Sequence, residues 1–212
     1  MRLLRGLLYR PISGVIMEGA FLAMLFRMKY INRWGLMRNS QTENLSQHTL
    51  ECAFLAHYLA SVGNKHFGKN YNAEKIAVYA MFHDCAEILT GDLPTPVKYH
   101  SEQMKSTYAE IENIAAKKLL SYLPDDMEDV YSGYITGEGL DEKSKKLIKQ
   151  ADKLCAYIKC IEEINAGNKE FSAAFSTIKA ELEKSDSSEL KFFLEKCLPS
   201  FSLSLDELKG TL

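Results

Sequence analysis

The chain has 212 residues, 46% of them hydrophobic and 25% charged, a composition that predicts one fairly large globular domain with a substantial core. Its formal net charge of −2 excludes the basic surface that holds a nucleic-acid polymer, although a small anionic substrate needs only one or two well-placed basic residues. The five cysteines lack CxxC spacing and lie among apolar neighbours, so we interpret them as reduced thiols of a cytoplasmic protein.

The N-terminal segment is apolar with scattered basic residues. Its longest charge-free run, residues 19–26, is far shorter than the ~20 residues that cross a bilayer, and no clean signal-peptide cleavage site follows. We therefore expect no membrane association. Residues 1–26 are interpreted as an extension plus the start of the first helix, and residues 27–208 as a single domain.

Helical periodicity along the chain predicts an all-α fold. Helices are expected over residues 19–30, 46–63, 73–89, 101–120, 125–134, 141–163, 171–184 and 189–198. The first should be buried, and the tail, residues 201–212, should pack back over the helices. Between the third and fourth helices, Gly91 suits a helix end and two prolines predict an extended rigid loop. That loop could hold Asp92 and Thr95 over a cavity, or be a turn with solvated hydroxyls.

Three polar residues interrupt the apolar face of the predicted helix over residues 73–89. His83, Asp84 and Glu87 would each cost free energy on burial unless they were paired or bound to a cation. Their spacing places Glu87 one turn after His83. This pattern is typical of a site rather than of a core, whereas Cys85, directed away from Glu87, is interpreted as a packing residue.

Three further polar positions are ambiguous when taken singly. His48, in the first turn of its helix, could be a surface or capping residue. Asp152 interrupts an apolar face and needs a partner, either Lys149 or a cation. Arg33 precedes Trp34, the single tryptophan, and is either a surface cation or an anion-binding guanidinium beside an aromatic wall.

Together, two imidazoles and two carboxylates on three helices form a mixed nitrogen and oxygen ligand set. His48, His83, Asp84 and Asp152 would suit a divalent transition metal, and cobalt, manganese, zinc and iron all remain open. Such a set leaves coordination positions free, which a catalytic metal requires. A closed structural zinc site is the weaker interpretation because no thiolate takes part.

Five stretches of the sequence resemble the HD-domain metal-dependent phosphohydrolases, and among them the bacterial 5′-deoxynucleotidases. They are INRW at 31–34, TENLSQH at 42–48, HDCAE at 83–87, LTGDLPTPVK at 89–98 and KQAD at 149–152. The resemblance covers about residues 27–208. It implies a single all-helical HD-domain bundle with the metal site between helices, a homodimer, and hydrolysis of deoxyribonucleoside 5′-monophosphates to deoxynucleosides and phosphate by attack of a metal-bound water on phosphorus.

The resemblance also implies roles for individual residues. The metal ligands would be His48, His83, Asp84 and Asp152; the substrate contacts would be Arg33, Trp34, His48, Asp84, Asp92, Leu93, Pro94, Thr95 and Asp152. Arg33 would orient the phosphate, Trp34 would exclude a 2′-hydroxyl, and Glu87 would handle protons. Two alternatives stay open: a broader nucleotidase or nucleotide pyrophosphohydrolase of the same superfamily, and a non-catalytic module in which the metal joins three helices.

Overall fold

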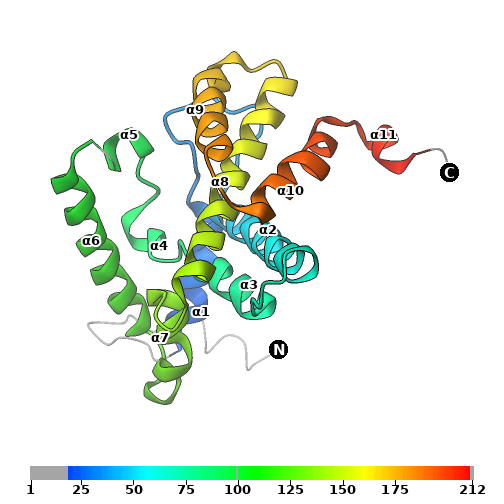
Figure 1. Cartoon of the computed structure of the whole chain (residues 1–212). Coiled ribbons are helices and arrows are strands. Elements are labelled where there is room, and N and C mark those ends of the chain that lie inside the picture. Colours follow the sequence, from blue (N-terminus) through cyan, green and yellow to red (C-terminus); the bar gives the residue numbers. More distant parts are fainter. Residues whose placement is uncertain (1–18, 99, 211–212) are drawn as a thin grey trace, which may run out of the picture.

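The computed structural model describes residues 19–98 and 100–210, which are helical apart from loops and one isolated antiparallel bridge between Asn32 and Asn44 (Figure 1). The predicted all-α class is confirmed. The elements are α1 (Ala20–Leu25), η1 (Phe26–Tyr30), α2 (Leu45–His66), α3 (Ala73–Phe82), α4 (Glu87–Thr90), α5 (Thr95–Lys98), α6 (Glu102–Leu120), η2 (Asp125–Met127), α7 (Glu128–Thr136), α8 (Glu142–Asn165), η3 (Lys169–Phe171), α9 (Ser172–Glu183), α10 (Ser188–Lys196), η4 (Leu198–Ser202) and α11 (Leu205–Lys209). Most of the predicted extension, residues 1–18, lies outside the described residues. None of the described helices is long and apolar enough to cross a membrane.

Helices α2 and α8 form the centre of the bundle. The side chain of Asn44 caps α2 in a capping box with Gln47, and Asp141 caps α8 by accepting the amides of Lys143 and Ser144. The main core lies where α2, α3 and α8 meet, with α9 and α10 packed against it. Figure 1 shows α8 running through the middle of the molecule, with α6 standing to one side.

A second apolar cluster joins α1 and η1 to α6, α7 and the start of α2. Phe21, Leu45 and Leu119 are almost fully buried in it. Cys85 belongs to the same cluster and is 1% exposed. The structure therefore places Cys85 in the core, as the packing interpretation of this thiol predicts.

The expectation of a buried first helix is wrong. Residues 19–30 form two short elements, and only Phe21 and Met28 are buried in them, while Leu22, Phe26 and Tyr30 are 58%, 71% and 65% exposed. A helix that packs against neighbours on one side leaves its other side exposed whatever its composition. On α2, likewise, one face packs into the core, and an apolar stripe of Leu50, Phe54 and Tyr58 is exposed.

The predicted helix over residues 73–89 is interrupted in the middle of its polar motif. α3 ends at Phe82, and the amides of Cys85, Glu87 and Ile88 then donate to carbonyl groups three residues earlier, at 2.9–3.2 Å. Such i→i−3 bonds tighten the backbone relative to an α-helix, so the side chains rotate away from the positions of a continuous helix. The break therefore changes the directions of the His83, Asp84 and Glu87 side chains within one short turn.

The segment after α4 differs from the predicted extended loop. Gly91 ends α4 with a φ of 75°, as expected for a terminating glycine. The carbonyl of Pro94 then accepts the amides of Val97 and Lys98, which starts the short helix α5. Pro96 lies in the first turn of α5, where a missing amide hydrogen leaves no intrahelical bond unmade.

The C-terminal tail also departs from its prediction. η4 packs against α8 and α10, but α11 extends away from the bundle instead of packing back over it (Figure 1). Leu203, Leu205 and Leu208 are 44–65% exposed. The ring of Phe201, 6.0 Å from that of Phe193 on α10, keeps the start of the tail against the bundle.

A buried polar cluster fixes the segment that leads into α2. The carboxylate of Glu163 on α8 is 1% exposed and accepts the amides of Ser40 and Gln41 and the side-chain amide of Asn168. Lys159, also buried, pairs with Glu163 and donates to the carbonyl of Gln41. Because each of these polar groups has a hydrogen-bond partner, the cluster anchors Ser40 and Gln41 to α8.

Substituting Glu163 by alanine should strongly destabilise the protein. The change leaves Lys159 buried without its counter-charge, and breaking a buried pair in this way costs about 3–5 kcal/mol. Glu183→Ala is the matched control, because Glu183 pairs with Lys179 on an exposed face of α9, where loss of a pair costs about 0–1 kcal/mol. Urea denaturation measures both; equal costs for the two variants would contradict the role given to Glu163.

Candidate metal centre and active site

Four predicted ligands come from three parts of the fold: His48, His83 and Asp84 lie close together, and Asp152 lies beside His48. His48 comes from α2, His83 and Asp84 from the turn after α3, and Asp152 from α8. Asp84 Oδ2 lies 3.1 Å from His83 Nε2 and 3.4 Å from His48 Nε2, and His48 Nε2 lies 3.2 Å from Asp152 Oδ1. The candidate ligand atoms of His48, His83 and Asp84 are all within 4.8 Å of one another.

The residues fit a divalent cation. Nε2 of His48 and Nε2 of His83 are both buried and make no hydrogen bond of good geometry. Nδ1 of His83 lies 2.7 Å from the carbonyl of Ala80, which can only accept, so Nδ1 carries a proton and Nε2 is the nitrogen left to bind a cation. Buried, unpartnered imidazole nitrogens beside carboxylates are the donor set that a transition metal satisfies.

Histidines and carboxylates compensate each other electrostatically. Burial opposes ionisation of Asp84, but His83 and His48 hold the pKa of Asp84 well below its usual range. Burial likewise opposes charging of His48, whereas Asp152 and Asp84 raise the pKa of His48 well above its usual value. A bound cation would replace the imidazolium protons as the counter-charge, so metal binding releases protons here.

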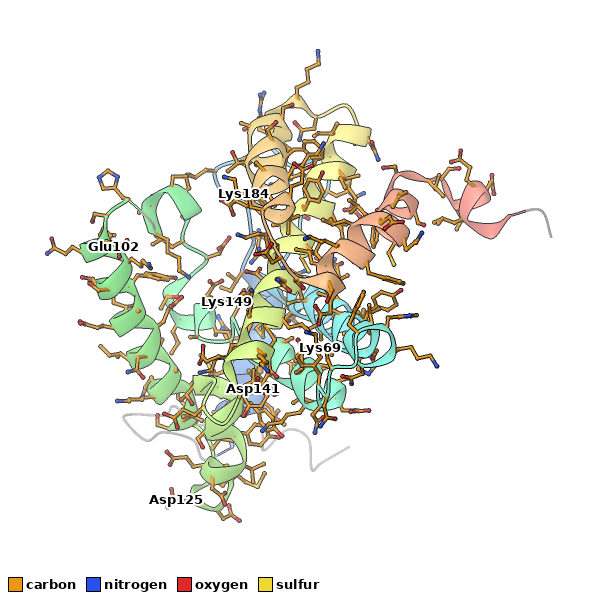
Figure 2. All side chains as sticks on the ribbon, viewed as in Figure 1. Lys69, Glu102, Asp125, Asp141, Lys149 and Lys184 are labelled. Carbon is orange, nitrogen blue, oxygen red and sulfur yellow. The ribbon has the colours of Figure 1, made fainter. Side chains whose placement is uncertain are left out.

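Asp152 lies beside His48 and not beside Lys149, the other partner that the sequence left open. Lys149 is exposed on α8, where Figure 2 labels it. Burial works against ionisation of Asp152, but the nearby imidazole of His48, 3.2 Å away, lowers the pKa of Asp152 overall. The structure therefore places Asp152 beside His48 and not beside Lys149.

Arg33 also belongs to the site, so its interpretation as a surface cation is wrong. Its side chain is 13% exposed, with a terminal nitrogen 3.5 Å from Asp84 Oδ2 and Nε 3.2 Å from Glu43 Oε1. Trp34 is half-buried, its ring centre 5.3 Å from that of Phe171. Trp34 has a φ of 60°, a left-handed conformation that costs a bulky residue about 1–3 kcal/mol.

Glu43 is the site residue to which the sequence assigned no role. It is 9% exposed and contacts Arg33, Trp34 and His48. Burial raises the pKa of Glu43, but His48 and Arg33 outweigh burial and lower it overall. An acidic residue directly before the helix cap Asn44 was the available signal, but such residues are usually solvated.

Glu87 is suited to carry a proton. It is 5% exposed at the start of α4, and its Oε2 is buried without a hydrogen-bond partner. Burial, together with the charges of Asp84 and Asp92, raises the pKa of Glu87 to about 8. A carboxyl group with a pKa near neutrality can both accept and donate a proton at working pH.

The loop after α4 brings Asp92 towards the site. Burial and the charge of Asp84 raise the pKa of Asp92, and Arg33 opposes them. Leu93 and Pro94 are half-buried in the same loop, and the side chain of Thr95 lies outside what the structure describes. The hydroxyl of Tyr108 on α6 holds the loop by donating to the carbonyl of Gly91 at 3.3 Å.

The fold is that of the HD-domain phosphohydrolases. An HD-domain phosphohydrolase from Listeria innocua aligns with a TM-score of 0.75 at 23% identity, covering 85% of this chain and 87% of its own. The HD phosphohydrolase of cyanophage S-2L, solved with dA and one catalytic Zn²⁺ ion bound, aligns with a TM-score of 0.59 at 19% identity, covering 84% and 96%.

Comparison with known sequences identifies a family within this class of phosphohydrolases. A model of the 5′-deoxynucleotidase YfbR-like family matches residues 20–201. The 5′-deoxynucleotidases YfbR of Escherichia coli O1:K1 and of E. coli strain ATCC 8739 are each 50% identical over 191 residues, which is 90% of this chain and 96% of each relative. The chain therefore belongs to the 5′-deoxynucleotidase YfbR-like family.

Proposed function

We propose that this protein hydrolyses deoxyribonucleoside 5′-monophosphates to deoxynucleosides and phosphate with the help of a divalent metal. The observation that carries the proposal is the buried cluster in which the free ring nitrogens of His48 and His83 face Asp84, with Arg33 beside it. The family of the chain supports the same activity. Asp152 completes the proposed ligand set from α8.

The proposed ligands, His48, His83, Asp84 and Asp152, offer two nitrogen and two oxygen donors. Zinc, cobalt, manganese and iron all accept such donors, and supply rather than raw affinity selects among them. A divalent metal bound there acts as a Lewis acid, and in favourable sites lowers the pKa of water from 15.7 to about 7.

The chain's own side chains bind and orient the nucleotide. The planar guanidinium of Arg33 can donate hydrogen bonds to two phosphate oxygens. Asp84, 3.5 Å away, holds this guanidinium beside the proposed metal ligands. His48, Asp84 and Asp152 then also lie against the phosphate. Trp34 stands next to the sugar, where it leaves no room for a 2′-hydroxyl. The rest of the nucleotide pocket is formed by Asp92, Leu93, Pro94 and Thr95.

Glu87 manages the proton of the reaction. Hydrolysis requires the attacking water to lose a proton and the leaving 5′-oxygen to gain one. A carboxyl group whose pKa is raised to about 8 by burial and by Asp84 and Asp92 can take the first proton and return it to the leaving oxygen. Phosphorus is attacked directly, so no covalent intermediate with the protein is needed.

Phosphate release from a substrate panel tests the proposal. After chelation and re-addition of single metals, we expect turnover of dAMP and a preference over AMP of about tenfold or more. A 3′-monophosphate and dATP should be poor substrates. A preference for AMP or dATP would favour the broader nucleotidase or the pyrophosphohydrolase, and no turnover with any metal would favour a non-catalytic module.

We also infer that the protein is a homodimer. Exposed apolar side chains occur on α1, η1 and α2, and η1 packs against α2. They are Leu22, Phe26, Tyr30, Leu50, Phe54 and Tyr58, exposed by 41–71%. Large apolar patches on a folded surface mark protein interfaces. Light scattering should give twice the chain mass of 24.0 kDa, and Phe54→Glu should reduce it to one chain mass; a wild-type monomer would contradict the inference.

We infer a cytoplasmic location from the cysteines. All five are free, and Cys52, Cys85, Cys155 and Cys160 are buried, which suits a reducing compartment. Fractionation of cells that express the tagged protein should recover it with cytoplasmic markers. Recovery with periplasmic or secreted markers would contradict this location.

A further inference from the structure

Both carboxylate oxygens of Glu43 are directed at site residues. Oε2 accepts the indole N–H of Trp34 at 2.7 Å. Oε1 lies 3.2 Å from Nε of Arg33 and 3.4 Å from Nδ1 of His48. One buried carboxylate therefore contacts three site residues. They are Trp34, proposed to lie next to the sugar, Arg33, proposed to bind the phosphate, and His48, a proposed metal ligand.

The backbone fixes Glu43 independently of those side chains. The amide of Arg33 donates to the carbonyl of Glu43 at 3.0 Å, and the amide of Leu45 donates to the carbonyl of Ile31 at 2.9 Å. Asn44, between these bonds, caps α2. Glu43 is thus tied to the rigid start of the central helix, and its carboxylate is a fixed reference point for the segment that carries Trp34.

The position of the Trp34 ring depends on a fixed hydrogen-bond partner of this kind. The backbone of Trp34 adopts a left-handed conformation with φ 60°, unusual for a bulky residue, and its ring packs on Phe171 at a tilt of 56°. Aromatic packing tolerates sliding of one ring over another, whereas a short hydrogen bond to a charged acceptor is directional. The bond to Glu43 therefore determines where the edge of the indole stands.

We propose that Glu43 is a positioning residue for sugar selectivity: it holds Trp34, together with Arg33, where a 2′-hydroxyl is excluded. The inference rests on the proposed deoxynucleotidase activity and deepens it. Steric discrimination of one hydroxyl depends on sub-ångström placement of the wall, and a displacement of about 1 Å is enough to change rates greatly. Glu43 needs no contact with the nucleotide to act in this way.

Glu43→Gln is the informative change because it keeps the shape and removes one acceptor. An amide has one accepting oxygen and one donating nitrogen. If the oxygen faces the indole, the amide nitrogen meets Nε–H of Arg33; if it faces Arg33, the amide nitrogen meets the indole N–H of Trp34. Either orientation places two donors against each other, and the neutral amide oxygen is also a weaker acceptor than the carboxylate, so the bond that holds the indole is weakened or lost in both orientations.

Fluorescence tests the positioning without any turnover. Trp34 is the single tryptophan, so emission from the metal-free protein reports this site alone. Glu43→Gln should shift the emission to longer wavelength and increase quenching by acrylamide. Glu102→Gln, at the exposed start of α6 (Figure 2), is the matched control and should leave both unchanged. Wild-type emission and quenching in Glu43→Gln would overturn the proposal.

Selectivity tests the consequence. The ratio of kcat/KM for dAMP to that for AMP does not depend on the fraction of folded enzyme, so simple destabilisation leaves it unchanged. We expect Glu43→Gln to lower this ratio by about tenfold or more. In a Trp34→Phe background, which lacks the indole donor, Glu43→Gln should lower it little further.

The outcomes separate the two claims. No dAMP preference in the wild type would refute the proposed function, while the fluorescence result would still decide the positioning. A dAMP preference that survives Glu43→Gln would overturn the role of Glu43 alone. If the glutamine variant does not fold, as judged by circular dichroism, Glu43→Asp replaces it: its carboxylate ends one methylene short of the indole, and the same two changes are expected.

Discussion

Glu87→Gln should lower kcat for dAMP hydrolysis by about 10²–10⁴-fold, the usual contribution of a general acid or base. Glutamine keeps the size of the side chain but cannot accept the proton of the attacking water or pass it on. Glu87 contributes none of the four proposed ligands, so metal affinity and nucleotide binding should stay close to those of the wild type. Single-turnover kinetics with metal and nucleotide saturating isolate the chemical step.

Glu74→Gln controls for the loss of one carboxylate, because Glu74 lies on α3, the helix that precedes the polar motif. Glu74 is exposed in the first turn of α3, and its substitution should leave kcat unchanged. A Glu87→Gln variant that binds metal and nucleotide normally and turns over dAMP at the wild-type rate would show that the proton is handled elsewhere.

His83→Ala should remove metal binding and, with it, activity. Losing an outer partner of a metal ligand typically weakens affinity about 10–100-fold, so loss of a ligand itself should exceed that range. Metal at 100 times its Kd should stabilise the wild type by about 2.7 kcal/mol, and this gain should disappear in the variant. Calorimetric titration of Co²⁺ or Zn²⁺ into chelator-treated protein, with thermal melts in parallel, measures both effects.

His57→Ala is the matched control for loss of an imidazole. His57 is exposed on α2, away from the buried face that carries His48. It should bind metal as the wild type does. Equal metal affinity in His83→Ala and His57→Ala would place the metal outside the proposed cluster.

The sequence predicted most helices because their signals are local. Periodic apolar positions defined α2, α6 and α8, and Asn44, Ser101 and Asp141 all cap helices in the structure. The predictions that proved wrong were those that depended on which elements pack against each other. The apolar residues around η1 were expected to be buried, because periodicity shows that a face is apolar but not what covers it.

For the site, residue type was more informative than local geometry. A His-Asp pair, a lone His and a distant Asp predicted the cluster of His48, His83, Asp84 and Asp152, which the structure brings together. The backbone break after Phe82 was not predicted, since i→i−3 bonds leave no compositional signal. Glu43 was passed over because its role depends on a contact between two loop segments that local patterns do not reveal.

Phosphate released from dAMP by the chelated protein, before and after one equivalent of Co²⁺ or Mn²⁺ is restored, shows whether the buried cluster is a catalytic metal centre. We expect no release before addition, turnover after it, and no recovery in Asp84→Asn, because the Asp84 side chain contacts His48, His83 and Arg33 in the wild type. Full turnover by the chelated protein, or full recovery in Asp84→Asn, would contradict this expectation.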